Sequence, residues 1–304
     1  MGKIATAIAS SHAFALLEPE AWEGGRTKNL ERYRSKYGPT APVHNGELES
    51  IEDASNRYKD IRNAHDLFSN LIIREKVTTA VIIGDDQDEN FNEDNLPQLA
   101  IYTGDTFTAE ARMFRSNRDV NLNLLSGLVR EGFEPAHIGK LKNDELLSHA
   151  HGPVLLRLLP DADIRVTLVF LNAIHLPAME PIRCYKLGMA IRKILSHTPE
   201  ETFAVIGSGG LSHFTAGYPW RDYSGKFCYG DISEEFDKRF VETVRNVKVG
   251  TFARSIGSKD LLNHGELETR SWLTVAGIMG KSRPQIVTYQ PFFRALMGMG
   301  VAVW

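Results

Sequence analysis

A histidine placed just beyond a predicted strand is the plainest sign of chemistry in this sequence. Residues 203–206 are mostly branched or aromatic, which suits a short buried strand, and the glycines that follow interrupt it. His213 ends this stretch, and an imidazole can bind a metal ion or carry a proton near neutral pH. An ordinary strand-to-loop turn with a surface histidine explains the same residues, so this stretch alone leaves both interpretations open.

Other polar side chains also follow predicted strands. They are His12 after residues 3–9, Asp86 and Gln87 after residues 78–84, and His175 after residues 164–170. In an open parallel sheet the carboxyl ends of the strands meet at one edge, where ligands bind. Chance explains such a gathering poorly, so we expect a functional pocket at this edge, with Asp86 and His175 as candidates for binding a substrate.

Two more candidates, His149 and His151, are separated by a single residue. Side chains at i and i+2 share a face only where the chain is extended, so we expect at most one of the two to point into a site.

A different environment is predicted for His65, which lies on the apolar stripe of a long helix. Ser50 and Asp53 resemble a capping box at the start of this helix, and we expect His65 to be a hydrogen-bonded core residue.

The elements that would position these side chains alternate between strands and helices. Besides the strands named above, the pattern predicts a strand over residues 97–102, helices over residues 51–72, 117–132, 181–196, 234–247 and 266–280, and closing segments at residues 284–289 and 299–304. Residues 19–37 predict either a surface helix or an irregular connection. This alternation implies an α/β fold with a central, largely parallel or mixed sheet that helices cover on both faces. Because repeats, low-complexity runs and linkers are missing, we expect residues 1–304 to form a single domain.

Composition narrows the classes of protein to which this chain can belong. With 42% hydrophobic and 24% charged residues and a net charge of -3, we expect a soluble globular protein without general attraction to nucleic acid or membrane. Only Cys184 and Cys228 occur, which argues against a disulfide scaffold and a multi-cysteine zinc site. The first residues do not resemble a signal peptide, and no apolar run of about twenty residues occurs, so we expect a cytoplasmic protein with a small polar or aromatic partner.

Common catalytic motifs are missing from the glycine-rich stretch. Residues 207–210 lack the spaced glycines of a dinucleotide-binding turn and the lysine of a phosphate-binding loop. The Gly-x-Ser-x-Gly elbow of many hydrolases does not occur there either. Histidine and carboxylate chemistry remains, which points first to a metal ion.

The order of several short segments resembles that of the class III extradiol ring-cleaving dioxygenases. These segments are residues 10–12, 151–152, 183–188, 207–213 and 268–272. The resemblance extends over nearly the whole chain and is strongest toward the catalytic subunit of protocatechuate 4,5-dioxygenase and the gallate and methylgallate dioxygenases. Its most specific element is the Gly-Gly-Leu-Ser-His sequence that ends at His213.

The resemblance implies a non-haem Fe(II) centre that opens an aromatic ring with O2. In that family two histidines and one glutamate hold the iron. His12 resembles the first histidine ligand and Glu268 the carboxylate ligand, whereas His213 and His151 resemble the histidines that bind substrate and oxygen and move protons. The substrate would be a catechol, a trihydroxylated aromatic or a hydroxypyridine, and the protein would be a homodimer or a higher homo-oligomer.

One position departs from the family pattern. The second histidine ligand follows an aspartate at the end of the second strand, and here Asp86 is followed by Gln87. An amide oxygen can coordinate iron, although more weakly than an imidazole, so Gln87 is a candidate either for a ligand or for a group beside the ligands. Other sources of the second nitrogen ligand are His44, His65 and His175, and His175 is the best placed because it too follows a strand.

Two further hypotheses stay open at the level of sequence. Gln87 also fits a non-catalytic binding or scaffold protein that kept this fold and lost the metal. A metal-dependent hydrolase is the other hypothesis, because histidine and glutamate bind zinc as readily as iron.

Overall fold

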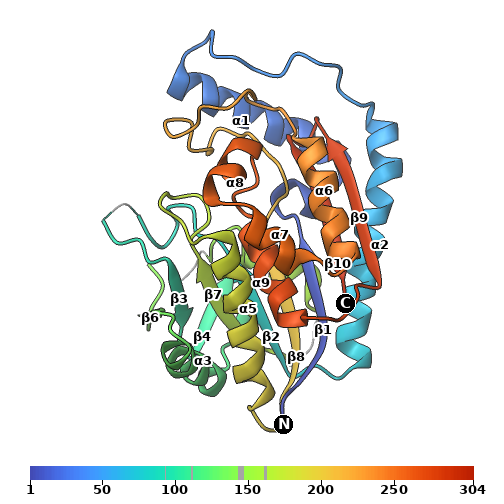
Figure 1. Ribbon diagram of the computed structural model, residues 1–304. Coiled ribbons are helices and arrows are strands. Elements are labelled where there is room, and N and C mark those ends of the chain that lie inside the picture. Colours follow the sequence, from blue (N-terminus) through green and yellow to red (C-terminus); the bar gives the residue numbers. More distant parts are fainter. Residues whose placement is uncertain (93, 111, 143–146, 161–162) are drawn as a thin grey trace.

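Four parallel, strongly apolar strands form the centre of the fold. They lie in the order β7 (Arg165–Leu171), β2 (Thr79–Gly84), β8 (Thr202–Ser208) and β1 (Lys3–Ser10). Strands that helices cover on both faces need such continuous apolar sequences, and every residue of β2 is buried. Figure 1 shows this arrangement in the computed structural model, which describes residues 1–92, 94–110, 112–142, 147–160 and 163–304.

Antiparallel pairings extend the central strands on both sides, so the sheet is mixed. On one side β3 (Leu99–Tyr102) runs antiparallel to β7 and is followed by β6 (Ala136–Ile138). On the other side β10 (Met297–Val303) runs antiparallel to β1 and is followed by β9 (Ile286–Phe292). The predicted closing segments of the tail are thus two strands. A separate hairpin joins β4 (Thr106–Ala109) to β5 (Arg112–Arg115).

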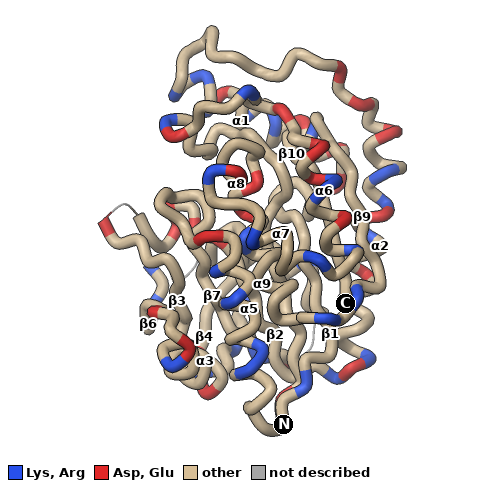
Figure 2. Tube along the Cα trace, viewed as in Figure 1, with Lys and Arg blue, Asp and Glu red and all other residues tan. Residues whose placement is uncertain are grey.

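Helices cover both faces of the sheet, as the alternating pattern predicted. Their bounds are α1 (Trp22–Tyr37), α2 (Ile51–Arg74), α3 (Arg118–Arg130), α4 (Gly152–Leu158), α5 (Pro181–Ser196), α6 (Glu234–Arg245), α7 (Val249–Ser255), α8 (Ser258–His264) and α9 (Thr269–Met279). Side chains of α2 and α4 pack on one face, and side chains of α3, α5, α6, α7 and α9 pack on the other. Figure 2 shows both signs of charge on the outer helices α1, α2 and α6, as expected for surfaces that face water.

The two helices nearest the central strands on one face, α5 and α9, approach each other very closely. A Cβ atom at Gly277 would lie 2.1 Å from the carbonyl oxygen of Tyr185, and one at Gly188 would lie 2.0 Å from that of Thr274. Only glycine permits this contact at both positions. Because α9 begins at Thr269, this packing also fixes the position of the preceding residue, Glu268.

Several local predictions are confirmed. Ser50 caps α2 by accepting a hydrogen bond from the backbone N–H of Asp53 at 3.0 Å. His65 is buried on α2 with Nε2 2.8 Å from Ser10 Oγ, as expected of a core histidine. Among the helices of the described residues, none combines the length and the apolar sequence needed to cross a membrane.

Candidate active site

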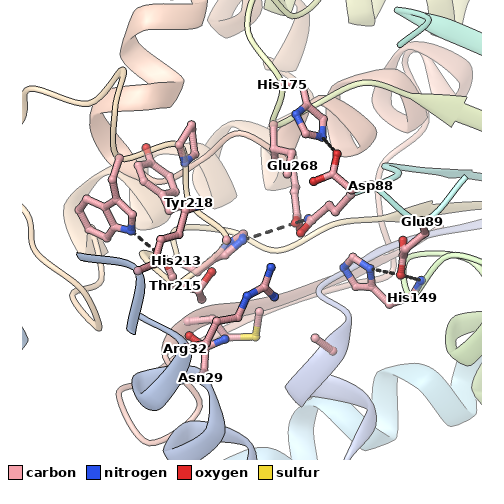
Figure 3. Close-up of a pocket in the computed structure, with 18 of the residues that line it drawn as sticks. Asn29, Arg32, Asp88, Glu89, His149, His175, His213, Thr215, Tyr218 and Glu268 are labelled. Atoms are coloured by element: carbon pink, nitrogen blue, oxygen red, sulfur yellow. Dashed lines mark hydrogen bonds and ion pairs between the residues drawn. The ribbon is translucent and has the colours of Figure 1, made fainter. Parts of the chain in front are cut away.

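The carboxyl ends of the central strands open into a pocket of about 940 Å³. His12, Gln87, His175 and His213 line it, each from the segment that follows a different central strand. Figure 3 shows that these segments meet side chains of α1 across the pocket. The topology therefore brings together residues that lie up to 201 positions apart, as His12 and His213 do.

Three of the lining residues form a set that can hold a metal ion. One possible ligand atom each from His12, His149 and Glu268 lies within 4.8 Å of the other two. His12 follows β1, His149 lies in the segment before α4, and Glu268 immediately precedes α9. Two imidazoles and one carboxylate match the donor set of non-haem Fe(II) sites, and they also suit zinc.

His12 is held in the form that binds metals. Its Nδ1 lies 3.0 Å from Ser208 Oγ, and we assign the ring proton to this nitrogen, which leaves the lone pair on Nε2. Burial lowers the pKa of His12 to about 4, so the ring is neutral near pH 7. Nε2 lies 3.4 Å from Glu268 Oε2. A neutral nitrogen lone pair and a carboxylate oxygen thus face each other, and a cation between them would satisfy both.

His149 has the hydrogen-bonding pattern of an oriented metal ligand. Its Nδ1 lies 3.0 Å from Glu89 Oε1, and the same oxygen accepts the backbone N–H of His149 at 2.9 Å. A carboxylate on Nδ1 fixes the tautomer in which Nε2 is free to bind a metal. Burial opposes the charged ring, but the hydrogen bond and charge of Glu89 raise the pKa of His149 above its ordinary value.

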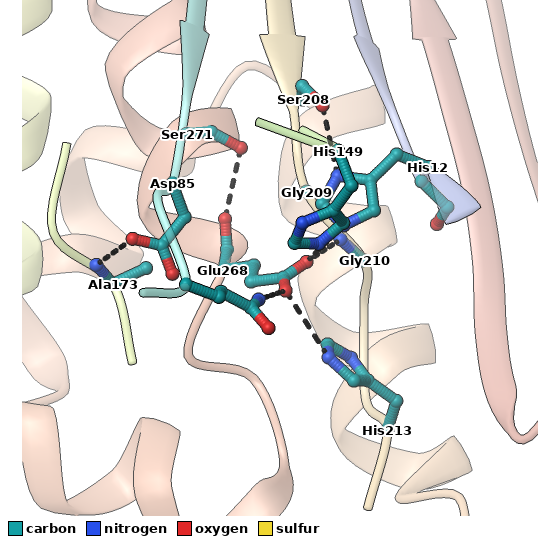
Figure 4. Close-up of polar contacts among 12 residues, drawn as sticks. His12, Asp85, His149, Ala173, Ser208, Gly209, Gly210, His213, Glu268 and Ser271 are labelled. Atoms are coloured by element: carbon teal, nitrogen blue, oxygen red, sulfur yellow. Dashed lines mark hydrogen bonds and ion pairs between the residues drawn. The ribbon is translucent and has the colours of Figure 1, made fainter. Parts of the chain in front are cut away.

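Glu268 is an ionised carboxylate that neighbouring donors fix in place (Figure 4). The backbone N–H of Gly210 donates to Oε2 at 2.6 Å, and the amide nitrogen of Gln87 donates to Oε1 at 2.8 Å. Burial alone would raise the pKa of Glu268, but His12, His213 and the Gly210 hydrogen bond hold it well below its usual range. The glycine-rich turn makes the approach possible, because a Cβ at Gly209 would lie 2.6 Å from the Glu268 carbonyl oxygen.

His213 presents one ring nitrogen to the pocket. Its Nδ1 lies 2.7 Å from the carbonyl oxygen of Leu211, and its Nε2 lies 3.4 Å from Glu268 Oε1. The adjacent residue is also fixed, since Ser212 donates from its backbone N–H and its hydroxyl to the buried Asp237. Burial disfavours the charged imidazole, yet the charge of Glu268 raises the pKa of His213 above its ordinary value. The ring of His213 is therefore held at the pocket beside Glu268.

Gln87 and Asp86 have different surroundings at the end of β2. Gln87 lines the pocket, and its amide nitrogen rather than its oxygen faces Glu268. Asp86 is not among the residues that line the pocket, because its carboxylate turns into the loop and accepts the backbone N–H groups of Glu89, Asn90 and Phe91. Asp86 thus shapes the loop that carries Gln87.

The resemblance implied a substrate- and oxygen-binding role for His151, but the structure places its neighbour His149 at the pocket. His151 is fully buried and does not line the pocket, because Ser148 Oγ lies 2.6 Å from its Nδ1 and the Val169 carbonyl oxygen lies 3.1 Å from its Nε2. Burial lowers the pKa of His151 to about 4. His149 points into the pocket in its place. The i and i+2 spacing predicted that at most one would do so, but it could not select which.

The other candidate histidines lie apart from the donor set. His175 lines the pocket with its Nε2 3.3 Å from Asp88 Oδ1. His44 pairs with Asp231 at 2.7 Å, and His65 lies in the core beneath Ser10. His149 therefore supplies the second imidazole of the set, which none of these three residues does.

Residues 74–303 match the family model described as the catalytic LigB subunit of aromatic ring-opening dioxygenase. The chain belongs to this family. The matched range contains Gln87, His149, His213 and Glu268, while His12 precedes it. Membership in the LigB family confirms the resemblance that the sequence motifs indicated.

Two individual proteins also show similarity to this chain. A stretch of 107 residues is 28% identical to gallate dioxygenase from Pseudomonas putida, which corresponds to 34% of this chain and 29% of that protein. The matched stretch thus spans less than a third of that relative. An uncharacterized protein from Escherichia coli K12 has a solved structure that matches over 98% of both chains with a TM-score of 0.54 and 12% sequence identity, which shows a shared fold.

Proposed function

We propose that this LigB-family chain is an Fe(II)-dependent extradiol dioxygenase. Its substrate would be a catechol, a trihydroxylated aromatic or a hydroxypyridine, and O2 would be the second substrate. The convergence of His12, His149 and Glu268 on one point supports the proposal most strongly. In the reaction the ring carbon–carbon bond beside the hydroxyl-bearing carbons breaks, and both oxygen atoms of O2 enter the product.

The donor set fits a divalent cation because a cation would make the contact between His12 and Glu268 favourable. Among the described residues, the free Nε2 of His12 faces a carboxylate oxygen at 3.4 Å, a contact that needs a proton or a cation to be favourable. The low pKa of His12 removes the proton near neutral pH. Bound Fe(II) would supply open coordination positions for the ring oxygens and for O2.

His213 is the residue that we propose to move protons. Its Nδ1 is occupied by the Leu211 carbonyl oxygen, so only Nε2 is available to the pocket. Nε2 would accept the proton of a ring hydroxyl as the substrate binds and would return a proton as the ring opens. Gln87 would assist by holding Glu268 Oε1 through its amide, which keeps the other carboxylate oxygen directed at His12.

Reconstitution tests this function directly. Purified protein would be loaded with Fe(II) without oxygen, its metal content measured, and oxygen uptake followed with catechols, gallate and hydroxypyridines. We expect Glu268→Ala to lose bound iron and activity with an unchanged circular dichroism spectrum. The exposed Glu242 offers a control, and Glu242→Ala should retain both iron and activity.

The same experiment separates the competing functions. Full iron occupancy and activity in Glu268→Ala would overturn the ligand assignment. Protein that binds zinc and hydrolyses esters or amides but consumes no O2 would instead be a hydrolase. Protein that binds aromatic ligands without retaining any metal would be a non-catalytic member of the family.

A further inference from the structure

One face of α1 carries an unpaired cation toward the pocket. Asn29, Arg32 and Lys36 are spaced i, i+3 and i+7, which places them on the same side of the helix, and all three line the pocket. Figure 3 shows the Arg32 side chain reaching from α1 toward the space in front of His213 and Glu268. The pocket wall opposite the strand ends is therefore basic.

Arg32 has no acidic partner among the described residues. No hydrogen bond or ion pair joins it to another described side chain, in contrast to Arg26 and Arg294, which both pair with Glu23. Its neighbours one helical turn away are Lys28, Asn29, Ser35 and Lys36, none of which is acidic. A guanidinium that faces a pocket without a carboxylate of its own is suited to bind an anion from solution.

Most acidic residues of the pocket interact with groups other than Arg32. Asp88 pairs with His175 and Glu89 with His149, while Glu268 belongs to the metal set. Asp222 also lines the pocket, and Arg221 stands next to it in the sequence. The negative charge of the pocket thus lies at the strand ends and at Asp222, whereas α1 contributes only positive charge.

The helix backbone on either side of Arg32 is anchored to the wall of the pocket. One turn before it, Asn29 Oδ1 accepts the backbone N–H of Ala216 at 3.0 Å, and Ala216 lies three residues after His213. Next to Arg32, the buried Tyr33 stacks on Tyr229 with ring centroids 4.5 Å apart. Both contacts attach α1 to the segment that follows His213, so the backbone that carries Arg32 keeps its place beside the pocket.

We propose that Arg32 recognises a carboxylate substituent on the aromatic substrate and thereby selects carboxylated rings. This inference rests on the proposed function, because it assumes that the ring hydroxyls face His12, His149 and Glu268. A carboxylate on the far side of the ring would then point toward α1. The guanidinium can donate two parallel hydrogen bonds to a carboxylate, which fixes the direction of the ring as well as adding affinity.

Matched ligand pairs test the selectivity of Arg32. The pairs are 3,4-dihydroxybenzoate with catechol and 3,4,5-trihydroxybenzoate with pyrogallol, which differ only in the carboxylate. Binding would be measured by calorimetry on Fe(II)-loaded protein without oxygen, and KM and kcat by oxygen uptake. Arg32→Ala should weaken binding of the carboxylated member by roughly ten- to a hundredfold, the range for a lost charged hydrogen bond, and change the other member by less than about twofold.

Two variants complete the design. Arg32→Lys keeps the charge without the two-pronged geometry and should restore part of the affinity. Arg34→Ala removes an exposed arginine of the same helix that does not line the pocket, and it should leave both ligands unaffected.

The outcomes distinguish this inference from the proposed function. Equal effects of Arg32→Ala on both members of a pair, or no effect on the carboxylated one, would overturn the role of Arg32 even if the rings are opened. Failure of all carboxylated rings to bind would overturn it as well. Carboxylate-dependent binding through Arg32 without any oxygen uptake would support the role of Arg32 and contradict the dioxygenase.

Discussion

At the scale of single residues, the place of a side chain relative to a strand end decides whether it reaches the pocket. His12, His213 and Gln87 line the pocket because each follows a central parallel strand, a rule that sequence patterns can apply. The second imidazole could not be chosen in this way. His149 meets Glu89, whereas His151 is buried against Ser148 and Val169, and the sequence spacing does not reveal these contacts.

The prediction at the scale of single residues concerns His213. His213→Ala should retain bound metal and lower turnover by roughly a hundredfold or more, because a proton-transfer group is lost while the three donors remain. Metal content and oxygen uptake on the same sample check it. His175→Ala removes another pocket histidine, one that pairs with Asp88, and should have a smaller effect. If the His213 variant purified without metal, His213 would have to be a ligand instead.

At the scale of elements, the long amphipathic segments were predictable and the short ones were not. The helix predicted over residues 181–196 is α5 with the same ends, since proline at its start and a regular apolar stripe define it. The helices α4, α7 and α8 have seven residues each, which is too short for a stripe to repeat. The charged sequence of α1 predicts either a surface helix or an irregular connection, because it does not reveal that one face of the helix lines a pocket.

The prediction at the scale of helices and strands concerns the close contact between α5 and α9. Gly277→Ala should destabilise the fold by about 1–3 kcal/mol, because the new methyl group would overlap the Tyr185 carbonyl oxygen. Urea unfolding monitored by circular dichroism measures this change. Gly24→Ala in α1 is the matched control, since nothing lies within 4 Å of its Cβ position and alanine favours a helix, so its stability should stay equal or rise. Equal stability of both variants would show that the two helices can move apart.

At the scale of the whole molecule, buried histidines couple stability to pH. Burial lowers the pKa of His65 to about 3, with smaller contributions from Arg157 and Arg62, whereas an unfolded histidine titrates near 6.5. The unfolded chain therefore binds more protons than the folded one over this window. The stability that neutral His65 contributes is complete above about pH 6.5 and is lost as the pH falls toward 3.

The corresponding prediction compares free energies of unfolding at pH 7 and pH 5, with a chelator present throughout. The contribution of His65 to the free energy of unfolding should fall by about 2 kcal/mol between pH 7 and pH 5. Over the same interval, His65→Gln should therefore lose about 2 kcal/mol less stability than the natural chain does. His197→Gln replaces an exposed histidine and should keep the full pH dependence. An unchanged pH dependence in the His65 variant would contradict the assignment.

The position of β1 between β8 and β10 has a consequence for how the protein is made. β1 is synthesised long before its partners, Thr202–Ser208 and Met297–Val303, so its pairing waits until these later strands have been made. Until then the nascent chain would expose β1 as an unpaired apolar strand. His12 follows β1 and can meet Glu268 only after residue 268 has been made and has folded. Capture of a metal ion would therefore report that these distant segments have come together.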